Sequence, residues 1–397
     1  MASPHVRNGT LGSLAVAALA VYILACSSFS PDDTKILFPA FDARTGDLGV
    51  SLYDRTTRQV EQVFVPSRPR GPEGTERETI LMRPQWMPDG KRIVAVWPGY
   101  SDNDDDVLNV AVLPLDGKGA VRLFAIPGIN DAKARLLAPP AVANTNLFLM
   151  ADSNLLVRLN LETGEITPRL MEGQGGGVLP FPRGDGLFYA AEITNQPPHY
   201  DVGTMDPATL AQTRLWQIKS EDMKEEGGGL AFSSDGKRLV VLQDKGGKPV
   251  LKVWQGQAQA KTVLLASKEE KIHLGNPCFS PKEDVIWASY AREKEGDRAA
   301  AYGLAEVPVQ GGAVRLVPLI EGMAETDKDD LPFFQVSLSH DGKTAALCSS
   351  YLAAQKMDEF KAGDCALFLV DLSNPERKVT KVPLPMPKKS AKAKKEE

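Results

Sequence analysis

Side chains that could bind a metal ion or carry out catalysis are few in this chain and are scattered along it. The densest carboxylate group is Asp102-Asn103-Asp104-Asp105-Asp106, whose acidic residues suggest a calcium loop. An EF-type loop that starts at Asp102 needs glycine at its sixth place and glutamate at its twelfth. Val107 and Leu113 stand there, so we expect a solvated loop and no metal site.

Arrangements typical of catalysis are incomplete as well. Gly342-Lys343-Thr344 matches the end of a phosphate-binding loop, but Ser337 stands where that motif needs its first glycine. The Gly-x-Ser-x-Gly motif of serine hydrolases is absent. His199 falls in a Pro-rich loop, His273 at the end of a loop, and His340 in a tight turn on the opposite face, so they do not converge easily on one site. We therefore expect a protein that is not an enzyme and binds no cofactor.

Four cysteines are too few for a disulfide-dense scaffold or for two zinc sites. Cys348 and Cys365 fall in two neighbouring predicted strands of the last repeat, so we interpret them as a candidate disulfide pair, with two buried thiols as the alternative. Cys278 is expected to be a small apolar residue inside the fold.

The composition is that of a folded protein. The chain has 397 residues, of which 43% are hydrophobic and 24% are charged. The formal net charge of −5 argues against nucleic acid as a partner, because phosphate binding needs a basic face. Four tryptophans fall within or at the ends of predicted strands, where we expect packing, with a sugar-binding platform as the alternative: Trp86, Trp97, Trp254 and Trp287.

One pattern recurs along the whole chain: a short apolar run, a tight polar turn and a second apolar run. The Asp-Gly turn supplies the positive φ that a tight hairpin needs, and the flanking aliphatic residues favour strands. Seven units start 39 to 59 residues apart, at Phe29, Trp86, Val142, Phe181, Phe232, Phe279 and Leu338.

A second hairpin follows the first in each unit, for example around Leu115-Asp116-Gly117 and Gln310-Gly311-Gly312. Each unit therefore holds four strands, which we name A to D in chain order. Seven four-stranded units of this length predict an all-β fold, a seven-bladed β-propeller of four-stranded blades. An array of β-sandwiches is the alternative.

The turn segments resemble a known repeat family. SPDDTKILF from Ser30, PDGKRIVAV from Pro88 and SSDGKRLVV from Ser233 are similar to the WD40-like (PD40-type) repeats of TolB-like propellers. The resemblance covers about residues 27–385 and implies a fold, not a reaction. TolB carries an additional N-terminal α/β domain, which this sequence lacks, so only the propeller is implied here.

The N-terminus has the pattern of an export signal. Residues 11–25 are fifteen residues without charge, which is short for a membrane-spanning helix. Ile23-Leu24-Ala25-Cys26 resembles the signal of bacterial lipoproteins, which implies that Cys26 is lipidated and becomes the mature N-terminus. An ordinary secretory signal or an uncleaved anchor is the alternative. We thus divide the chain into a signal peptide (1–25), the propeller (26–385) and a disordered Lys-rich tail (386–397).

The two ends of the strands differ in their connections. The A–B and C–D turns are tight and share one face of a propeller, whereas the B–C and D–A connections share the other and are longer. Examples are a B–C loop at 291–298 and D–A loops at 67–78 and 219–229. Binding residues concentrate on long loops held by a rigid scaffold. We expect an envelope protein or glycan to bind this B–C/D–A face, with tolerated insertions as the alternative.

These expectations describe a lipid-anchored β-propeller of the bacterial cell envelope that is a non-catalytic scaffold. Its membrane contact is the lipid on Cys26, and Ser27 after that cysteine favours the outer membrane. The alternatives are a propeller enzyme of the lyase or lactonase type that uses the central channel, and a sensor that binds a small ligand.

Overall fold

The computed structural model describes most of the chain from Ser27 to Leu384. The described ranges are 27–41, 48–66, 82–100, 106–116, 119–127, 140–151, 155–171, 174–180, 186–194, 197–220, 230–244, 249–255, 261–264, 271–282, 284–294, 297–323, 336–348 and 366–384. Within these ranges, no helix is long and apolar enough to cross a membrane.

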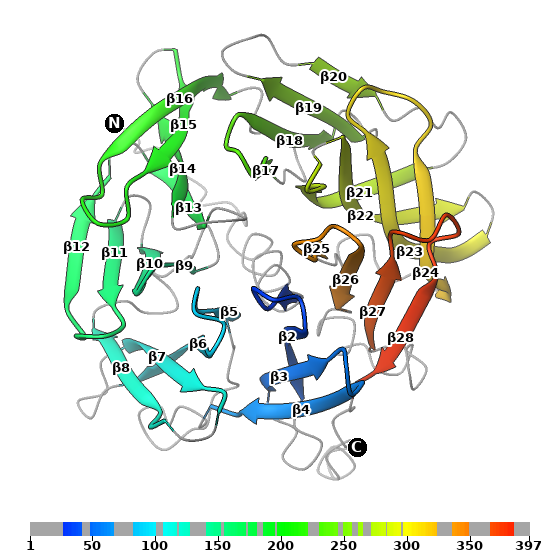
Figure 1. Cartoon of the computed structure of the whole chain (residues 1–397). Coiled ribbons are helices and arrows are strands. Elements are labelled where there is room, and N and C mark those ends of the chain that lie inside the picture. The colour runs from blue at the N-terminus through cyan, green and yellow to red at the C-terminus, as the bar shows by residue number, and fades with distance from the viewer. Residues whose placement is uncertain are drawn as a thin grey trace, which may run out of the picture.

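The described residues form seven four-stranded antiparallel sheets arranged in a ring, which is a seven-bladed β-propeller (Figure 1). This confirms the predicted fold. Each blade is a meander in which strands A to D follow one another in chain order, with strand A nearest the centre of the ring.

The first four blades contain sixteen strands. Blade 1 has β1 (Ser28–Phe29), β2 (Lys35–Phe41), β3 (Leu48–Asp54) and β4 (Gln59–Phe64). Blade 2 has β5 (Met82–Trp86), β6 (Arg92–Tyr100), β7 (Asp106–Pro114) and β8 (Arg122–Pro127). Blade 3 has β9 (Ala141–Ala143), β10 (Asn146–Ala151), β11 (Leu155–Asn160) and β12 (Ile166–Leu170). Blade 4 has β13 (Gln174–Pro180), β14 (Leu187–Ile193), β15 (His199–Met205) and β16 (Gln212–Lys219).

The last three blades complete the ring. Blade 5 has β17 (Leu230–Phe232), β18 (Arg238–Asp244), β19 (Pro249–Gln255) and β20 (Lys261–Leu264). Blade 6 has β21 (Lys271–Phe279), β22 (Val285–Lys294), β23 (Asp297–Pro308) and β24 (Arg315–Met323). Blade 7 has β25 (Val336–Leu338), β26 (Thr344–Cys348), β27 (Ala366–Asp371) and β28 (Val379–Pro383).

The apolar core is divided among the interfaces between blades. The described residues contain seven hydrophobic clusters, and each lies between two neighbouring blades. In β2, Ile36 and Phe38 belong to the cluster shared with blade 7, whereas Leu37 belongs to the cluster shared with blade 2. Because both faces of a blade are covered, its central strands are near-continuous apolar runs without polar alternation.

The ring closes without exchange of a strand between its ends. Strands β1 to β4 all belong to blade 1, and β25 to β28 all belong to blade 7. Noncovalent contacts between blades 7 and 1 therefore join the two ends of the ring. We call this interface between blades 7 and 1 the seam.

One predicted connection is wrong in its extent, and two histidines lie in strands. The sequence places a loop at 291–298, but β22 runs to Lys294 and β23 begins at Asp297, because the antiparallel pairing continues outward and satisfies more backbone groups. His199, predicted in a Pro-rich loop, begins β15, and His273 lies within β21.

Candidate functional site

The A–B turns have a shared hydrogen-bonding design. In blade 5, the Ser233 hydroxyl donates to Asp235 Oδ1 at 2.8 Å and accepts the backbone N–H of Arg238 at 2.9 Å. Asp235 Oδ1 also accepts the backbone N–H of Lys237 at 3.0 Å. The serine and aspartate thus supply the hydrogen bonds that hold the turn. The same pattern recurs in two further blades, with Ser30 and Asp32 in blade 1 and Ser339 and Asp341 in blade 7.

These hydrogen bonds stabilise the ionised carboxylates. The hydroxyl of Ser30, together with donors on Thr34, lowers the pKa of Asp32. The backbone N–H of Lys237, with the Ser233 hydroxyl, lowers the pKa of Asp235. Because Oδ1 of each of these aspartates is engaged within its own turn, the carboxylates hold the hairpins.

The turn glycines are required by both backbone conformation and space. Gly342 has φ of +70°, and a Cβ added there would lie 2.9 Å from the ring of Pro281 in blade 6. Gly90 has φ of +65° and faces Pro31 of blade 1 in the same way, at 3.4 Å. At these interfaces a glycine therefore packs on the proline of the preceding A–B turn.

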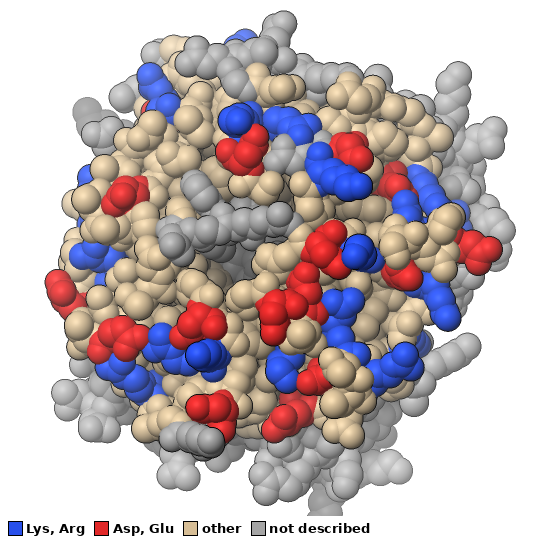
Figure 2. Space-filling model, in the orientation of Figure 1, with Lys and Arg blue, Asp and Glu red and all other residues tan. Residues whose placement is uncertain are grey.

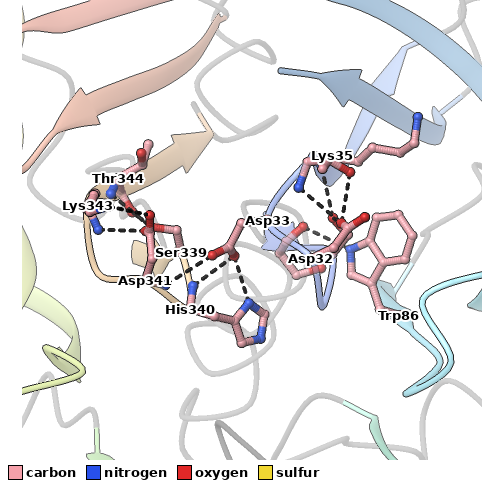
Figure 3. Close-up of polar contacts among 12 residues, drawn as sticks. Asp32, Asp33, Lys35, Trp86, Ser339, His340, Asp341, Lys343 and Thr344 are labelled. Carbon is pink, nitrogen blue, oxygen red and sulfur yellow. Dashed lines mark hydrogen bonds and ion pairs between the residues drawn. The ribbon is translucent and has the colours of Figure 1, made fainter. Parts of the chain in front are cut away.

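The seam replaces this contact with a hydrogen-bonded pair (Figure 3). Asp33 stands where glycine stands in other turns and has φ of +59°. His340 stands where Pro31 and Pro281 stand in theirs. Asp33 Oδ1 lies 2.7 Å from His340 Nδ1 and accepts the His340 backbone N–H at 2.8 Å, while Oδ2 accepts the backbone N–H of Asp341 at 3.0 Å. Since a carboxylate only accepts, Nδ1 of His340 must carry the proton.

Arg55, from the C–D turn of blade 1, supports the same place. Its guanidinium donates to the backbone carbonyl of Asp33 at 2.7 Å and to the hydroxyl of Thr344 in blade 7 at 2.8 Å. The charged groups around His340 therefore include Asp33 and Asp341 as carboxylates and Arg55 and Lys343 as cations. Together they join the first and last blades through polar groups.

The A–B and C–D turns share one face, as predicted. Backbone hydrogen bonds join the two turns within blades: Leu115 donates to Lys91, and Leu372 donates to Lys343. We call this surface the tight-turn face and the surface at the opposite strand ends the long-loop face. Figure 2 shows basic and acidic side chains interspersed over the surface, with acidic side chains beside the central hollow.

Charges on the tight-turn face also pair across blades. Glu162 of blade 3 accepts from Arg92 at 2.5 Å and from Arg122 at 2.9 Å, and both arginines belong to blade 2. Arg377 of blade 7 pairs with Glu306 of blade 6 at 2.8 Å. These groups therefore connect neighbouring blades.

On the long-loop face, the described residues include the start of β15 in blade 4. His199 lies with Nδ1 2.9 Å from the carbonyl oxygen of Pro197 and Nε2 3.5 Å from Asp201. Half-burial and the neighbouring carboxylate of Glu192 raise the pKa of Tyr200 to about 12. His199 and His340 thus lie on opposite faces with different partners and do not form one site.

The remaining candidate residues divide between described and undescribed parts of the chain. Cys348 is buried in β26 opposite Leu367, as expected for strand B, but its predicted partner Cys365 lies outside the described residues. The disulfide therefore stays a prediction. Cys26, the signal segment and the tail 386–397 also lie outside the described residues, as do Asp102 to Asp105 and the acidic segment 324–330.

The other sequence expectations concern packing and metal binding. Trp97, Trp254 and Trp287 are buried between blades, and Trp86 is half-buried and donates from Nε1 to the carbonyl oxygen of Ser28 at 3.1 Å. These positions confirm the packing role. Burial raises the pKa of the Cys278 thiol to about 12, and the side chain is partly buried against the apolar cluster between blades 6 and 7. Among the described residues, no group of three or more His, Cys, Asp or Glu is arranged to hold a metal ion.

Comparisons with known proteins agree on fold and go no further. No family model and no curated protein matches the sequence. The complex of KlAtg21 with the coiled-coil of AgAtg16 contains a similar structure, with a TM-score of 0.53, 11% identity and coverage of 92% of this chain and 100% of that one. KlHsv2 with a Gly-Ser linker in place of loop 6CD has a TM-score of 0.50 and 8% identity, over 89% of this chain and 96% of that one.

TolB from Acinetobacter baumannii is also similar in structure. Its TM-score is 0.42 at 16% identity, and the match covers 73% of this chain and 65% of the TolB chain. At identities this low, the two matches with TM-scores of 0.53 and 0.50 show a shared propeller architecture and nothing about a ligand or a reaction.

Proposed function

We propose that this chain is a lipid-anchored β-propeller of the bacterial cell envelope that binds a protein or glycan without catalysing a reaction. Cys26 would carry the lipid, and the long-loop face would bind the partner. The membrane in question would be the outer membrane.

One observation supports the long-loop face as the binding face: charged side chains on the tight-turn face pair with groups of the propeller itself. The turn carboxylates Asp32, Asp235 and Asp341 accept hydrogen bonds from their own turns, and Glu162 and Glu306 pair with arginines of the adjacent blades. Groups used in this way to hold a scaffold are poorly placed to recognise a ligand. The long connections of the opposite face are thus the better candidates for recognition.

The fold is suited to such a role. A propeller with the same architecture is known in a complex with a coiled-coil, that of KlAtg21 with AgAtg16. In the present chain, seven apolar interfaces and the ion pairs between blades provide a rigid disc on which loops can be displayed.

The binding proposal is tested by crosslinking in intact cells, followed by affinity capture of the tagged protein from solubilised envelope. Enrichment of one or two envelope proteins or a glycan is expected, and it should be lost when the connections at 67–78 and 219–229 are shortened. Lys237→Glu on the tight-turn face is the matched control and should retain the partner. Capture that survives loop shortening but fails in the control would overturn the assignment of the face.

The lipid anchor has its own test. Cys26→Ala should release the protein from membranes into the soluble envelope fraction, and the mature wild-type protein should show the added mass of acyl chains. Unchanged membrane association of Cys26→Ala would contradict the lipidation.

A further inference from the structure

We propose that two copies of this chain associate through β8 of blade 2, by antiparallel pairing of the two β8 strands. This interface lies at the rim of the disc, and it requires neither a lipid anchor nor a partner of the long-loop face. Three features of the described residues support it: the free edge of β8, the apolar side chains around that edge, and the balance of charge beside it.

Strand β8 is a sheet edge with regular geometry. It is the last strand of its blade, and no described strand pairs with its outer side (Figure 1). Its pairing with β7 is continuous from Arg122 to Pro127, without a register shift. On the outer side, backbone N–H and C=O groups of alternate residues are therefore in position to pair with another extended backbone.

The other outer strands carry features that discourage such pairing. Register shifts interrupt the pairing of β4, β16 and β24 with their neighbouring strands. Strand β12 contains Pro168, β20 has only four residues, and β28 contains Lys381. Bulges, prolines, short lengths and lysines are common means of protecting a sheet edge. Strand β8 has none of these in its interior, since its one proline, Pro127, is its last residue.

Exposed apolar side chains gather at this edge. Leu123 of β8 lies opposite Ala111, on the face of blade 2 that looks toward blade 1, and 67% of it is exposed. Six large hydrophobic side chains are exposed among the described residues, and four of them belong to the outer parts of blades 2 and 3: Val121, Leu123, Ile166 and Leu170. The rim is thus most apolar where its edge strand is least protected.

Two of these side chains extend the apolar surface onto blade 3. Ile166 pairs with Leu159, which belongs to the cluster between blades 2 and 3, so Ile166 is on the face that looks toward blade 2. Leu170 is four residues further along β12 and therefore shares that face, and 72% of it is exposed. A strand added to β8 would lie next to both.

The charges beside β8 allow a second β8 to approach. Arg122 is the only charged residue of the strand, and Glu162 of blade 3 accepts from it at 2.9 Å. Glu162 also pairs with Arg92, which in turn pairs with Asp89, so two cations and two carboxylates balance one another. A twofold pairing of β8 strands therefore brings no uncompensated like charges together.

The strand is also complementary to itself in shape and polarity. When antiparallel strands pair about a twofold axis, equivalent side chains of the two strands lie on the same face of the joined sheet. Leu123 of each copy would then cover apolar surface of the other. An extended, aliphatic strand without net charge is what this edge accommodates, and β8 of a second copy is such a strand.

The size of the contact sets its expected strength. Stable interfaces bury about 1,200–2,000 Å² in total, and one pair of six-residue strands buries less than that. We therefore expect a reversible dimer with a Kd of about 10–100 µM.

Sedimentation velocity of the full chain carrying Cys26→Ala measures this association, because no acyl chain can then cause it. A shift from monomer to dimer is expected between about 5 and 300 µM, a range that brackets the expected Kd. Leu123→Lys adds a lysine to the edge and brings like charges together, so it should weaken the dimer by about tenfold or more. Val379→Lys, at an exposed apolar position of β28, is the matched control and should change the Kd by less than about twofold.

Pulsed dipolar spectroscopy identifies the strands that meet. Ala125→Cys in β8 and Val379→Cys in β28 provide exposed positions for a nitroxide label. Opposite residues of paired strands are about 5 Å apart, so the label at 125 should report a short separation between copies. The label at 379, in blade 7, should report a much longer one. The unsubstituted protein controls for labelling of the native cysteines.

A monomer at every concentration would overturn the proposed interface. A dimer that Leu123→Lys leaves intact, or a shorter separation at 379 than at 125, would also overturn it, because the copies would then meet elsewhere. Urea unfolding of Leu123→Lys should match that of the wild type, which separates lost association from lost folding. Neither partner capture nor membrane release enters these measurements, so their failure is distinct from failure of the proposed function.

Discussion

Asp33 and His340 are 307 residues apart in the chain and 2.7 Å apart in the structure. Their contact closes the ring at the one interface where no peptide connection joins the two blades. The same two turn positions hold a glycine and a proline between blades 6 and 7 and between blades 1 and 2. The seam thus uses a directional hydrogen bond where these two interfaces use van der Waals packing.

A double-mutant cycle should reveal this coupling. Asp33→Gly removes the carboxylate without backbone strain, because φ is positive there, and should lower the free energy of unfolding by about 1–3 kcal/mol. His340→Pro alone should also destabilise, whereas the double variant recreates the Pro–Gly pair and should be more stable than additivity predicts. Urea unfolding measures all four proteins. Strict additivity would contradict the coupling.

The turn glycines permit a test of packing against backbone strain. Gly342→Ala places a Cβ 2.9 Å from Pro281 at φ of +70°, whereas Gly311→Ala places one at φ of +89° with nothing within 4 Å. Both pay the cost of the left-handed conformation, about 1–2 kcal/mol. Only Gly342→Ala should lose a further 1 kcal/mol or so by overpacking. Equal losses in thermal or urea unfolding would refute the contact between the A–B turns.

The pair of Arg377 and Glu306 should contribute more than exposed pairs do. The guanidinium contacts both carboxylate oxygens, at 2.8 and 3.0 Å from Nη2, and lies over the ring of Trp287. Glu306→Gln should cost about 1–2 kcal/mol of unfolding free energy, because the arginine stays partly buried. Lys237→Met breaks an exposed pair with Asp235 and should cost less than about 0.5 kcal/mol. A larger loss of unfolding free energy for Lys237→Met than for Glu306→Gln would contradict this ranking.

Acid should weaken the propeller through its turns. The lowered pKa values of Asp32 and Asp235 mean that their hydrogen bonds stabilise the fold above the unfolded value near 3.8. This contribution is lost as the pH falls through the folded pKa values. Urea midpoints should therefore drop below about pH 4, and the deficit of Asp235→Asn relative to wild type should shrink there. A deficit that is constant from pH 6 to 3 would argue against this role of the carboxylate.

The repeat units could be recognised from sequence because they depend on local chemistry. A serine, an aspartate and a glycine within four residues form a hairpin turn through contacts with their own backbone, as Ser233, Asp235 and Gly236 do. Blade 3 was harder to recognise because Asn144 supplies the positive φ in place of glycine. The extent of β22 and β23 was missed, since antiparallel pairing depends on the partner strand more than on the local sequence.

The sequence by itself determined the number of blades, the all-β class and the face that each type of turn occupies, because these follow from turn chemistry and from short apolar runs in the local sequence. Only the tertiary structure decided how the ring closes. The meaning of Asp33 at a glycine position and His340 at a proline position depends on their meeting across the seam. The burial of Ser27 likewise depends on the closed ring, because its hydrogen bonds are to Ala346 and Ser337 of blade 7. Contacts between residues about 300 positions apart are set by the closed geometry of seven packed sheets, which no local pattern encodes.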